Sequence, residues 1–183
     1  AIVMRHSAEG APLYATKAVD PIIINAGDGA HEHPTQALLD MYSILEKKES
    51  LEGLKVVIIG DIMHSRVARS NIYGLTKMGA DVHLAGPRTM VYPELEKLGV
   101  TVHHDIREAV ANADVVNVLR IQLERIHSAL YPTNREYARI FGINNEVLKL
   151  AKDDVMVMHP GPMNRGLEIA PDVAYSDQSV IQE

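Results

Sequence analysis

The feature that most constrains the fold is a regular alternation of strand and helix patterns from residue 55 onward. Five short runs are rich in aliphatic residues, and turns and helical stretches separate them; the runs are 56–59, 81–85, 101–104, 114–119 and 154–158. The first run is apolar at every position, which is typical of a strand buried on both faces of a parallel sheet. Strand-helix alternation with short turns favours right-handed crossovers between neighbouring strands. We therefore expect an α/β protein with a doubly wound parallel sheet flanked by helices.

Signals for helix ends support this alternation. A helix over 65–78 is predicted to end before Gly79, since glycine is the usual residue after a helix end. Asp105 and Thr133 each precede a glutamate by three positions, which is the pattern of a capping box at a helix start. Further helical stretches are expected over 93–98 and 144–152.

Upstream of the alternation, a glycine-rich turn leads into another predicted helix. The segment 25–40 contains Gly27 and Gly29, which permit left-handed backbone angles, and Pro34, which suits a first helical turn. After Pro34, apolar residues recur at i, i+3, i+4 and i+7, which predicts one buried helical face running to about Lys48. The residues of this predicted face are Leu38, Met41, Tyr42 and Leu45.

His33 and Gln36 lie at the opening of this predicted helix. Free backbone N–H groups and the positive end of the helix dipole are expected beside them, which is a place to hold an anion or a developing negative charge. On shape alone, an ordinary histidine near a helix cap is the favoured interpretation. Before this segment we expect a strand over 1–4, a short helix over 11–18 that packs Leu13 and Ala15, and a buried strand over 21–25.

Arginines follow three of the predicted strands. Arg66 comes after the first strand of the alternation, Arg120 and Arg125 after the fourth, and Arg165 after the fifth. Because parallel strands end at one edge of a sheet, we expect these guanidinium groups to gather there. Guanidinium binds carboxylate and phosphate bidentately, so a small polyanionic ligand is indicated. Each arginine taken alone is equally explained as a surface charge.

Composition excludes several classes of protein. The net charge of −6 argues against a general nucleic-acid surface. The sequence has no apolar run of the roughly 18 residues that a membrane span needs. The absence of cysteine removes thiol catalysis and fits a cytoplasmic protein. No nucleic-acid or membrane partner is therefore expected.

Cofactor motifs are also missing. The turn after the first strand of the alternation has one glycine, Gly60, and bulky residues after it, so it does not match a dinucleotide-binding fingerprint. The pairs His31/His33 and His103/His104 lack the spacing of a catalytic zinc pair on a helix. We expect neither a metal nor a cofactor.

Several motifs together carry a resemblance to a known family. The segment Asn-Ala-Gly-Asp-Gly-x-x-x-His-Pro-Thr-Gln-x-Leu-Leu-Asp at 25–40 resembles the aspartate and ornithine carbamoyltransferases. Three more segments agree in order and spacing: Met-Arg-His at 4–6, Gly-Asp-x-x-x-x-Arg at 60–66 and Leu-Arg-x-Gln-x-Glu-Arg at 119–125. The segment His-Pro-Gly-Pro-x-Asn-Arg-Gly at 159–166 is similar to the aspartate enzymes in particular. The resemblance covers essentially the whole chain.

The resemblance implies a fold and an activity. Residues 1–50 would be the later part of a carbamoyl-phosphate domain with the interdomain helix, and residues 51–183 a nearly complete aspartate domain. The implied reaction moves a carbamoyl group from carbamoyl phosphate to L-aspartate, giving N-carbamoyl-L-aspartate and phosphate in de novo pyrimidine biosynthesis. Neither a metal nor another cofactor takes part in it.

The same resemblance implies roles for individual residues. Arg5 and His33 would act in catalysis by donating to the carbamoyl oxygen, and with Gln36 would bind carbamoyl phosphate. The residues implied for L-aspartate are Arg66, Arg120 and Gln122, with backbone carbonyls of Gly161 and Pro162 facing the carbamoyl group and the amine. Arg125 would instead pair with an acidic neighbour to hold its loop.

The resemblance also implies missing parts and partners. The family's phosphate-binding Ser-Thr-Arg-Thr-Arg segment and its lysine loop would lie before Ala1, and its last helices after Glu183, so we expect these residues alone to be poorly active. Family members form homotrimers with shared active sites, some with a regulatory chain or a dihydroorotase partner.

Two alternatives stay open. One is ornithine carbamoyltransferase, although that enzyme has a cysteine where this chain has Pro160. The other is a non-catalytic binding module with the same fold.

Overall fold

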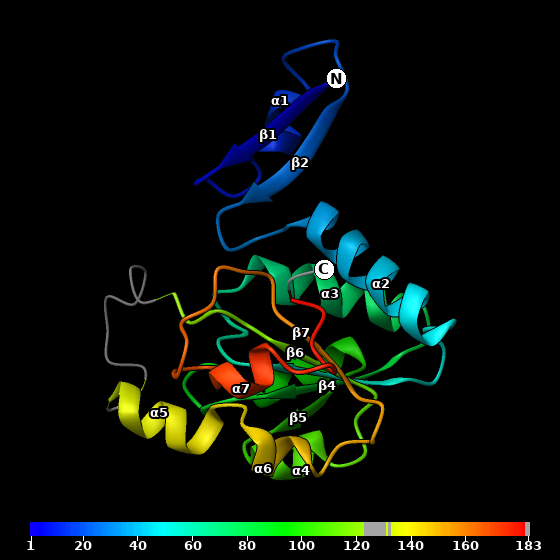
Figure 1. The fold of residues 1–183 in the computed structure, drawn as a ribbon. Coiled ribbons are helices and arrows are strands. Elements are labelled where there is room, and N and C mark those ends of the chain that lie inside the picture. The colour runs from blue at the N-terminus through cyan, green and yellow to red at the C-terminus, as the bar shows by residue number, and fades with distance from the viewer. Residues whose placement is uncertain (123–130, 132, 182–183) are drawn as a thin grey trace.

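The computed structural model describes residues 1–122, 131 and 133–181. Its main body is a five-stranded sheet in the order β5-β4-β3-β6-β7, and every neighbouring pair of strands is parallel (Figure 1). The strands are β3 (Lys55–Ile59), β4 (Asp81–Ala85), β5 (Thr101–His103), β6 (Val115–Val118) and β7 (Met156–Met158). The predicted α/β fold with a doubly wound parallel sheet is confirmed.

Helices cover both faces of this sheet. They are α3 (Arg66–Lys77), the 3₁₀ helix η1 (Pro93–Leu98), α4 (Ile106–Val110), α5 (Asn134–Phe141), α6 (Asn145–Leu148) and α7 (Pro171–Ala174). Successive residues of β3 point to opposite faces, so Ile58 packs with α3 and α5, whereas Val57 packs with α4, α6 and α7. Both residues are fully buried, which explains the apolar run in the sequence.

Side-chain caps are present at three helix starts, including the two predicted at Asp105 and Thr133. The side chain of Ser65 accepts from the N–H of Ala68 at the start of α3, and Thr133 accepts from the N–H of Glu136 at the start of α5. Asp105 accepts from the N–H of Arg107 at the start of α4. Each cap satisfies a backbone donor that the helix itself leaves without a partner.

A smaller unit of residues 1–28, called the N-terminal unit below, lies apart from the five-stranded sheet (Figure 1). It contains two parallel strands, β1 (Ile2–His6) and β2 (Ile23–Asp28), with α1 (Ala11–Ala15) between them in the chain. The helix α2 (Pro34–Lys48) joins this unit to the main body and packs on α3.

The expected burial of the N-terminal unit is wrong. Leu13, predicted to pack inside, is 68% exposed, and Ile22 in the predicted buried strand is 73% exposed. The second strand also begins later and runs further than predicted, from Ile23 to Asp28. The physical reason is that two strands and one short helix make too thin a structure to cover both faces of each strand.

The predicted buried face of α2 is also wrong, although the helix ends at Lys48 as expected. Leu38 and Tyr42 are 62% and 63% exposed, and the buried residues are Ala37, Asp40 and Ile44. This second set is also spaced at helical intervals, so spacing alone does not decide which set faces the sheet.

The helices α2 and α3 pack closely on each other. A Cβ atom added to Gly74 of α3 would lie 2.8 Å from the terminal methyl carbon of Met41. The two helices therefore meet where α3 has no side chain, and of the predicted face Met41 is the residue that packs against the core.

Candidate functional site

A cavity of about 220 Å³ lies where the N-terminal unit, α2 and the main body meet. The residues that line it are Arg5, His33, Gln36, Ser65, Arg66, Val67, Arg120, Gln122, Pro160, Gly161 and Pro162. They come from the end of β1, the starts of α2 and α3, and the loops after β6 and β7. This is the carboxyl edge of the sheet, where open α/β folds bind ligands. All the residues that the family resemblance implies for the site therefore line one cavity.

His33 is held at the N-terminus of α2. Its ring accepts through Nδ1 from the backbone N–H of Gln36 at 3.4 Å, and its own backbone N–H donates to Ser70 Oγ of α3 at 2.9 Å. Since Nδ1 accepts, the ring proton is on Nε2, which is then a donor. Burial lowers the pKa of His33, and the guanidinium groups of Arg66 and Arg5 lower it further. The ring is therefore a neutral donor near pH 7.

Arg66 is almost completely buried, with 7% of its surface exposed. Its guanidinium lies against the backbone of Gly27, because a Cβ atom there would be 2.9 Å from Arg66 Cζ. One guanidinium nitrogen, NH1, also lies 3.4 Å from the carbonyl oxygen of Gly29, to which it donates. The glycine-rich end of β2 and the turn after it thus shape the place where the arginine lies, and they connect the N-terminal unit to α3.

Asp28 holds this turn together. Its carboxylate accepts from the N–H groups of Gly10 at 2.6 Å and Glu32 at 3.1 Å, and from the side chain of Asn25 at 2.9 Å. His31 Nδ1 lies 3.0 Å from the same carboxylate. Burial alone would raise the pKa of Asp28, but these hydrogen bonds lower it to about 2. The turn therefore rests on an ionised, buried carboxylate.

The loops after β6 and β7 are tied to each other. Asn164 Nδ2 donates to the carbonyl oxygen of Ile121 at 2.8 Å, between Arg120 and Gln122 of the cavity. Glu168 is buried and accepts from the backbone N–H of Asn164. The same carboxylate lies 3.2 Å from Nε2 of His159, which begins the loop of Gly161 and Pro162. These contacts hold both loops at the cavity.

Two of the predicted arginines are not part of the cavity as described. The guanidinium carbon of Arg165 lies 5.3 Å from the centre of the Tyr175 ring, and the residue is exposed. The prediction that Arg165 joins the others is therefore wrong; the loop after β7 continues past the cavity before this residue is reached. Arg125 lies outside the described residues.

Sequence reasoning missed several residues around the cavity. Ser65 and Val67 line it because they flank Arg66, and Pro160 lines it as part of the predicted loop. Asp40 accepts a hydrogen bond from Gln36 at 2.8 Å. Asp40 closes the motif at 25–40, and its i+4 spacing from Gln36 is the signal that could have identified it.

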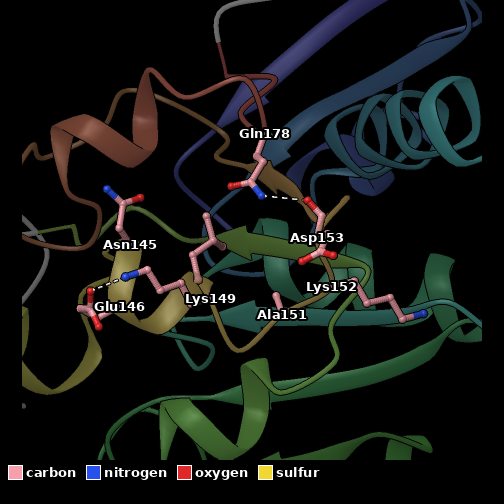
Figure 2. Close-up of a pocket in the computed structure, with 8 residues that line it drawn as sticks. Asn145, Glu146, Lys149, Ala151, Lys152, Asp153 and Gln178 are labelled. Atoms are coloured by element: carbon pink, nitrogen blue, oxygen red, sulfur yellow. Dashed lines mark hydrogen bonds and ion pairs between the residues drawn. The ribbon is translucent and has the colours of Figure 1, made fainter.

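A second hollow, of about 550 Å³, lies at the opposite edge of the sheet, before β7 (Figure 2). Its polar side chains contact their neighbours and do not converge on a common point as those of the cavity do. Lys149 pairs with its own helix neighbour Glu146 at 2.7 Å, and both side chains are about 70% exposed. Gln178 donates to the carbonyl oxygen of Asp153. This hollow is a solvated surface rather than a convergent site.

Within the described residues, no group of three or more histidine, aspartate or glutamate side chains is arranged to hold a metal ion. Nδ1 of His83 and Nε2 of His103 lie 2.8 Å apart and share one hydrogen bond, and the two rings are stacked. None of the helices in the described part of the chain is long and apolar enough to cross a membrane.

Comparisons with known proteins agree with this geometry. Residues 52–183 match the family model described as aspartate/ornithine carbamoyltransferase, Asp/Orn binding domain, and residues 1–46 match the carbamoyl-P binding domain of the same family. The aspartate carbamoyltransferase catalytic subunit of Desulforamulus reducens is 59% identical over 182 residues, which are 100% of this chain and 58% of that protein. This chain thus spans somewhat more than half the length of the curated relatives it matches.

Solved structures give the same result. Aspartate transcarbamoylase from Trypanosoma cruzi in complex with phosphate aligns with a TM-score of 0.82 at 31% identity, over 98% of this chain and 60% of that one. Ornithine carbamoyltransferase from Pyrococcus furiosus aligns with a TM-score of 0.83 at 31% identity, over 98% and 59%. The chain belongs to the aspartate/ornithine carbamoyltransferase family.

Proposed function

We propose that the protein transfers the carbamoyl group of carbamoyl phosphate to L-aspartate, giving N-carbamoyl-L-aspartate and phosphate in pyrimidine biosynthesis. The observation that carries this proposal is the single cavity that gathers two sets of residues. One set, for carbamoyl phosphate, is Arg5, His33 and Gln36. The other set, for L-aspartate, is Arg66, Arg120 and Gln122, with Gly161 and Pro162 providing backbone carbonyls.

The chemistry follows from the donors in the cavity. The amine nitrogen of aspartate attacks the carbamoyl carbon, a C–N bond forms, negative charge grows on the carbonyl oxygen, and the C–O bond to phosphate then breaks. Phosphate leaves with the electrons of that C–O bond, and it takes up the proton that the amine nitrogen loses. His33 donates through Nε2, and Arg5 donates through its guanidinium, to the oxygen that gains charge.

Positioning of aspartate is the second contribution. L-Aspartate carries two carboxylates, and two guanidinium groups line one cavity, that of Arg66 at the start of α3 and that of Arg120 in the loop after β6. Carbonyls of the loop at Gly161 and Pro162 accept from the amine. Holding two substrates in line for reaction can supply several kcal/mol of the rate increase.

Aspartate fits this cavity better than ornithine. Ornithine has one carboxylate and a second amine that is cationic, and Arg5, Arg66 and Arg120 would repel that cation. The relatives of about 60% identity are named aspartate carbamoyltransferase catalytic subunits. Ornithine carbamoyltransferase and a non-catalytic binding module remain the competing hypotheses.

We propose the following organisation for the whole protein. Residues 1–50 belong to a carbamoyl-phosphate domain and residues 51–183 to an aspartate domain, which the family matches to residues 1–46 and 52–183 support. The protein works in the cytoplasm as a homotrimer whose subunits share active sites, with a regulatory chain or dihydroorotase as a further partner. The relatives are named catalytic subunits, which supports an assembly. Sedimentation velocity of the whole protein tests it.

The activity is tested by calorimetric titration with a bisubstrate analogue that joins a phosphonoacetyl group to L-aspartate. We expect tight binding to the whole protein and much weaker binding to residues 1–183 alone. The matched control is the analogue made with ornithine. Preference for the ornithine analogue would contradict the substrate assignment, and binding of neither analogue by the whole protein would favour the non-catalytic module.

A further inference from the structure

Asp40 is a buried carboxylate whose described partners are all side-chain amides. It lies on the inner face of α2 and is 6% exposed. Its Oδ1 accepts from Gln36 Nε2 at 2.8 Å, and its Oδ2 accepts from Asn71 Nδ2 of α3 at 2.6 Å and from Asn117 Nδ2 of β6 at 3.3 Å. Three elements of the fold therefore meet at one carboxylate.

Such an arrangement is costly for the fold. Burying an ionised carboxylate costs free energy that neutral amide partners repay only in part. Burial accordingly raises the pKa of Asp40, while the hydrogen bonds from Asn71, Gln36 and Asn117 oppose this rise. An apolar residue would fill the same place between two helices and a strand more cheaply. The position therefore calls for a role that an apolar residue does not fill.

The role follows from the difference between a carboxylate and an amide. A carboxylate only accepts hydrogen bonds. The Gln36 amide has two ends of nearly the same shape, an oxygen that accepts and an NH₂ group that donates. Asp40 therefore holds the Nε2 end of Gln36 toward itself. This contact leaves the Oε1 end unused, and Gln36 lines the cavity together with Arg5 and His33.

We propose that Asp40 is a positioning residue that fixes the Gln36 amide with its oxygen available to the cavity, and that this oxygen selects a ligand carrying N–H next to its carbonyl group. The proposal rests on the proposed function, since carbamoyl phosphate is such a ligand. Arg5 and His33 are donors that match the carbonyl and phosphate oxygens of many acyl phosphates. The Gln36 oxygen adds an acceptor that a carbamoyl NH₂ satisfies and a methyl group does not.

The test compares carbamoyl phosphate with acetyl phosphate, in which a methyl group replaces the NH₂. Calorimetric titration with each compound is carried out on the whole protein and on its Asp40→Asn variant. The introduced asparagine can turn its Nδ2 either toward Gln36 or toward Asn71 and Asn117. We expect the first orientation, because it requires only the Gln36 amide to flip, whereas the second requires the amides of both Asn71 and Asn117 to flip. Gln36 then presents N–H to the ligand. We expect the affinity for carbamoyl phosphate to fall about tenfold and that for acetyl phosphate to change by less than about twofold.

Two further variants separate positioning from a structural role. Asn71→Ala removes a partner of Asp40 but leaves the contact between Asp40 and Gln36, so it should lower stability and keep the preference for carbamoyl phosphate. The double variant Gln36→Glu with Asp40→Asn exchanges the two groups. The introduced glutamate then accepts from the introduced asparagine with one oxygen and offers the other to the ligand, so the preference should return.

Each outcome decides the proposal. Equal losses for both phosphates in Asp40→Asn, or an unchanged preference, would overturn it. If Asp40→Asn does not fold, the double variant is compared with the unaltered protein, and a double variant that is unfolded or lacks the preference overturns the proposal. If the unaltered protein binds neither phosphate, the proposed function fails instead, so the two failures are distinguishable.

Discussion

The five-stranded sheet and the N-terminal unit are both parallel β structures, but they are held together by different forces. In β3, Val56, Val57, Ile58 and Ile59 are all fully buried. In the N-terminal unit, Val3 is 69% exposed, and the order of the unit centres on the polar contacts of Asp28. The difference shows that an apolar strand pattern indicates which side chains can be buried. It does not indicate whether other elements of the fold are present to cover them.

The strongest way to test this comparison is to place the same charge in each region. Val57→Asp would bury an unpaired carboxylate between β3 and its helices and should cost more than about 4 kcal/mol of unfolding free energy, enough to prevent folding. Val3→Asp should change it by less than about 0.5 kcal/mol. Urea denaturation followed by circular dichroism measures both. A large effect of Val3→Asp would mean that this position is covered in solution.

A second test uses glycine positions of the N-terminal unit. Gly27 has a φ of 115° and Gly10 a φ of 76°, so alanine is strained at both, by about 1–2 kcal/mol. A methyl group at Gly27 also displaces the guanidinium of Arg66, whereas nothing lies within 4 Å of one at Gly10. Gly27→Ala should therefore weaken binding of the aspartate analogue about tenfold or more, at a cost in stability similar to that of Gly10→Ala. Calorimetric titration of both variants checks this, and equal affinities would contradict the packing of Arg66 on Gly27.

Lowering the pH should destabilise the N-terminal unit through Asp28. The pKa of Asp28 is lowered to about 2, below its ordinary value, so the unfolded unit binds more protons than the folded one. The stabilisation that ionised Asp28 gives to the folded unit is complete above about pH 4 and is lost as the pH falls toward 2. Asp28→Asn should remove about 1–2 kcal/mol at neutral pH and flatten this dependence. Amide NMR signals of residues 1–28, followed against those of β3, measure it; loss of both sets at one pH in the unaltered protein would argue against a separate polar anchor.

The smallest expected effect is at the edge of the five-stranded sheet. Burial lowers the pKa of His103, and the neighbouring His83 and Lys55 lower it further, while Glu108 opposes the shift. Since the folded state then resists protonation, stability should decrease as the pH falls from about 7 to 5, by less than about 1 kcal/mol after solvent screening. His103→Gln should reduce this slope in thermal melts between those pH values and leave the part that His33, whose pKa is also lowered, contributes. An unchanged slope would show that His103 does not contribute to it.

Much of the main sheet is predictable from the sequence. The runs 56–59 and 81–85 coincide with β3 and β4, and the helix expected at 65–78 is α3 within one residue at each end. These elements are predictable because burial on both faces leaves a continuous aliphatic signal and because Ser65 and Gly79 mark the ends of the helix. Local chemistry is sufficient there.

Contacts between elements are less predictable. The helical spacing in α2 is satisfied by two residue sets, and packing against the rest of the fold buries the one that contains Asp40. The site residues were identified through the family motifs, whereas physical reasoning alone predicted arginines at one sheet edge. It placed Arg165 there wrongly, because the length and path of a loop decide where its later residues lie. The role of Asp40 depends on amides from α3 and β6, which no local pattern of α2 contains.

The strand order β5-β4-β3-β6-β7 has a consequence for how the chain folds during synthesis. The central strand β3 finds its first neighbour, β4, soon after it is made, but its other neighbour, β6, is made only after β4, η1, β5 and α4. Until then, one edge of a strand rich in aliphatic residues has no pairing partner. The nascent chain thus passes through an interval in which its most buried strand is its most association-prone segment, and that interval closes when β6 leaves the ribosome.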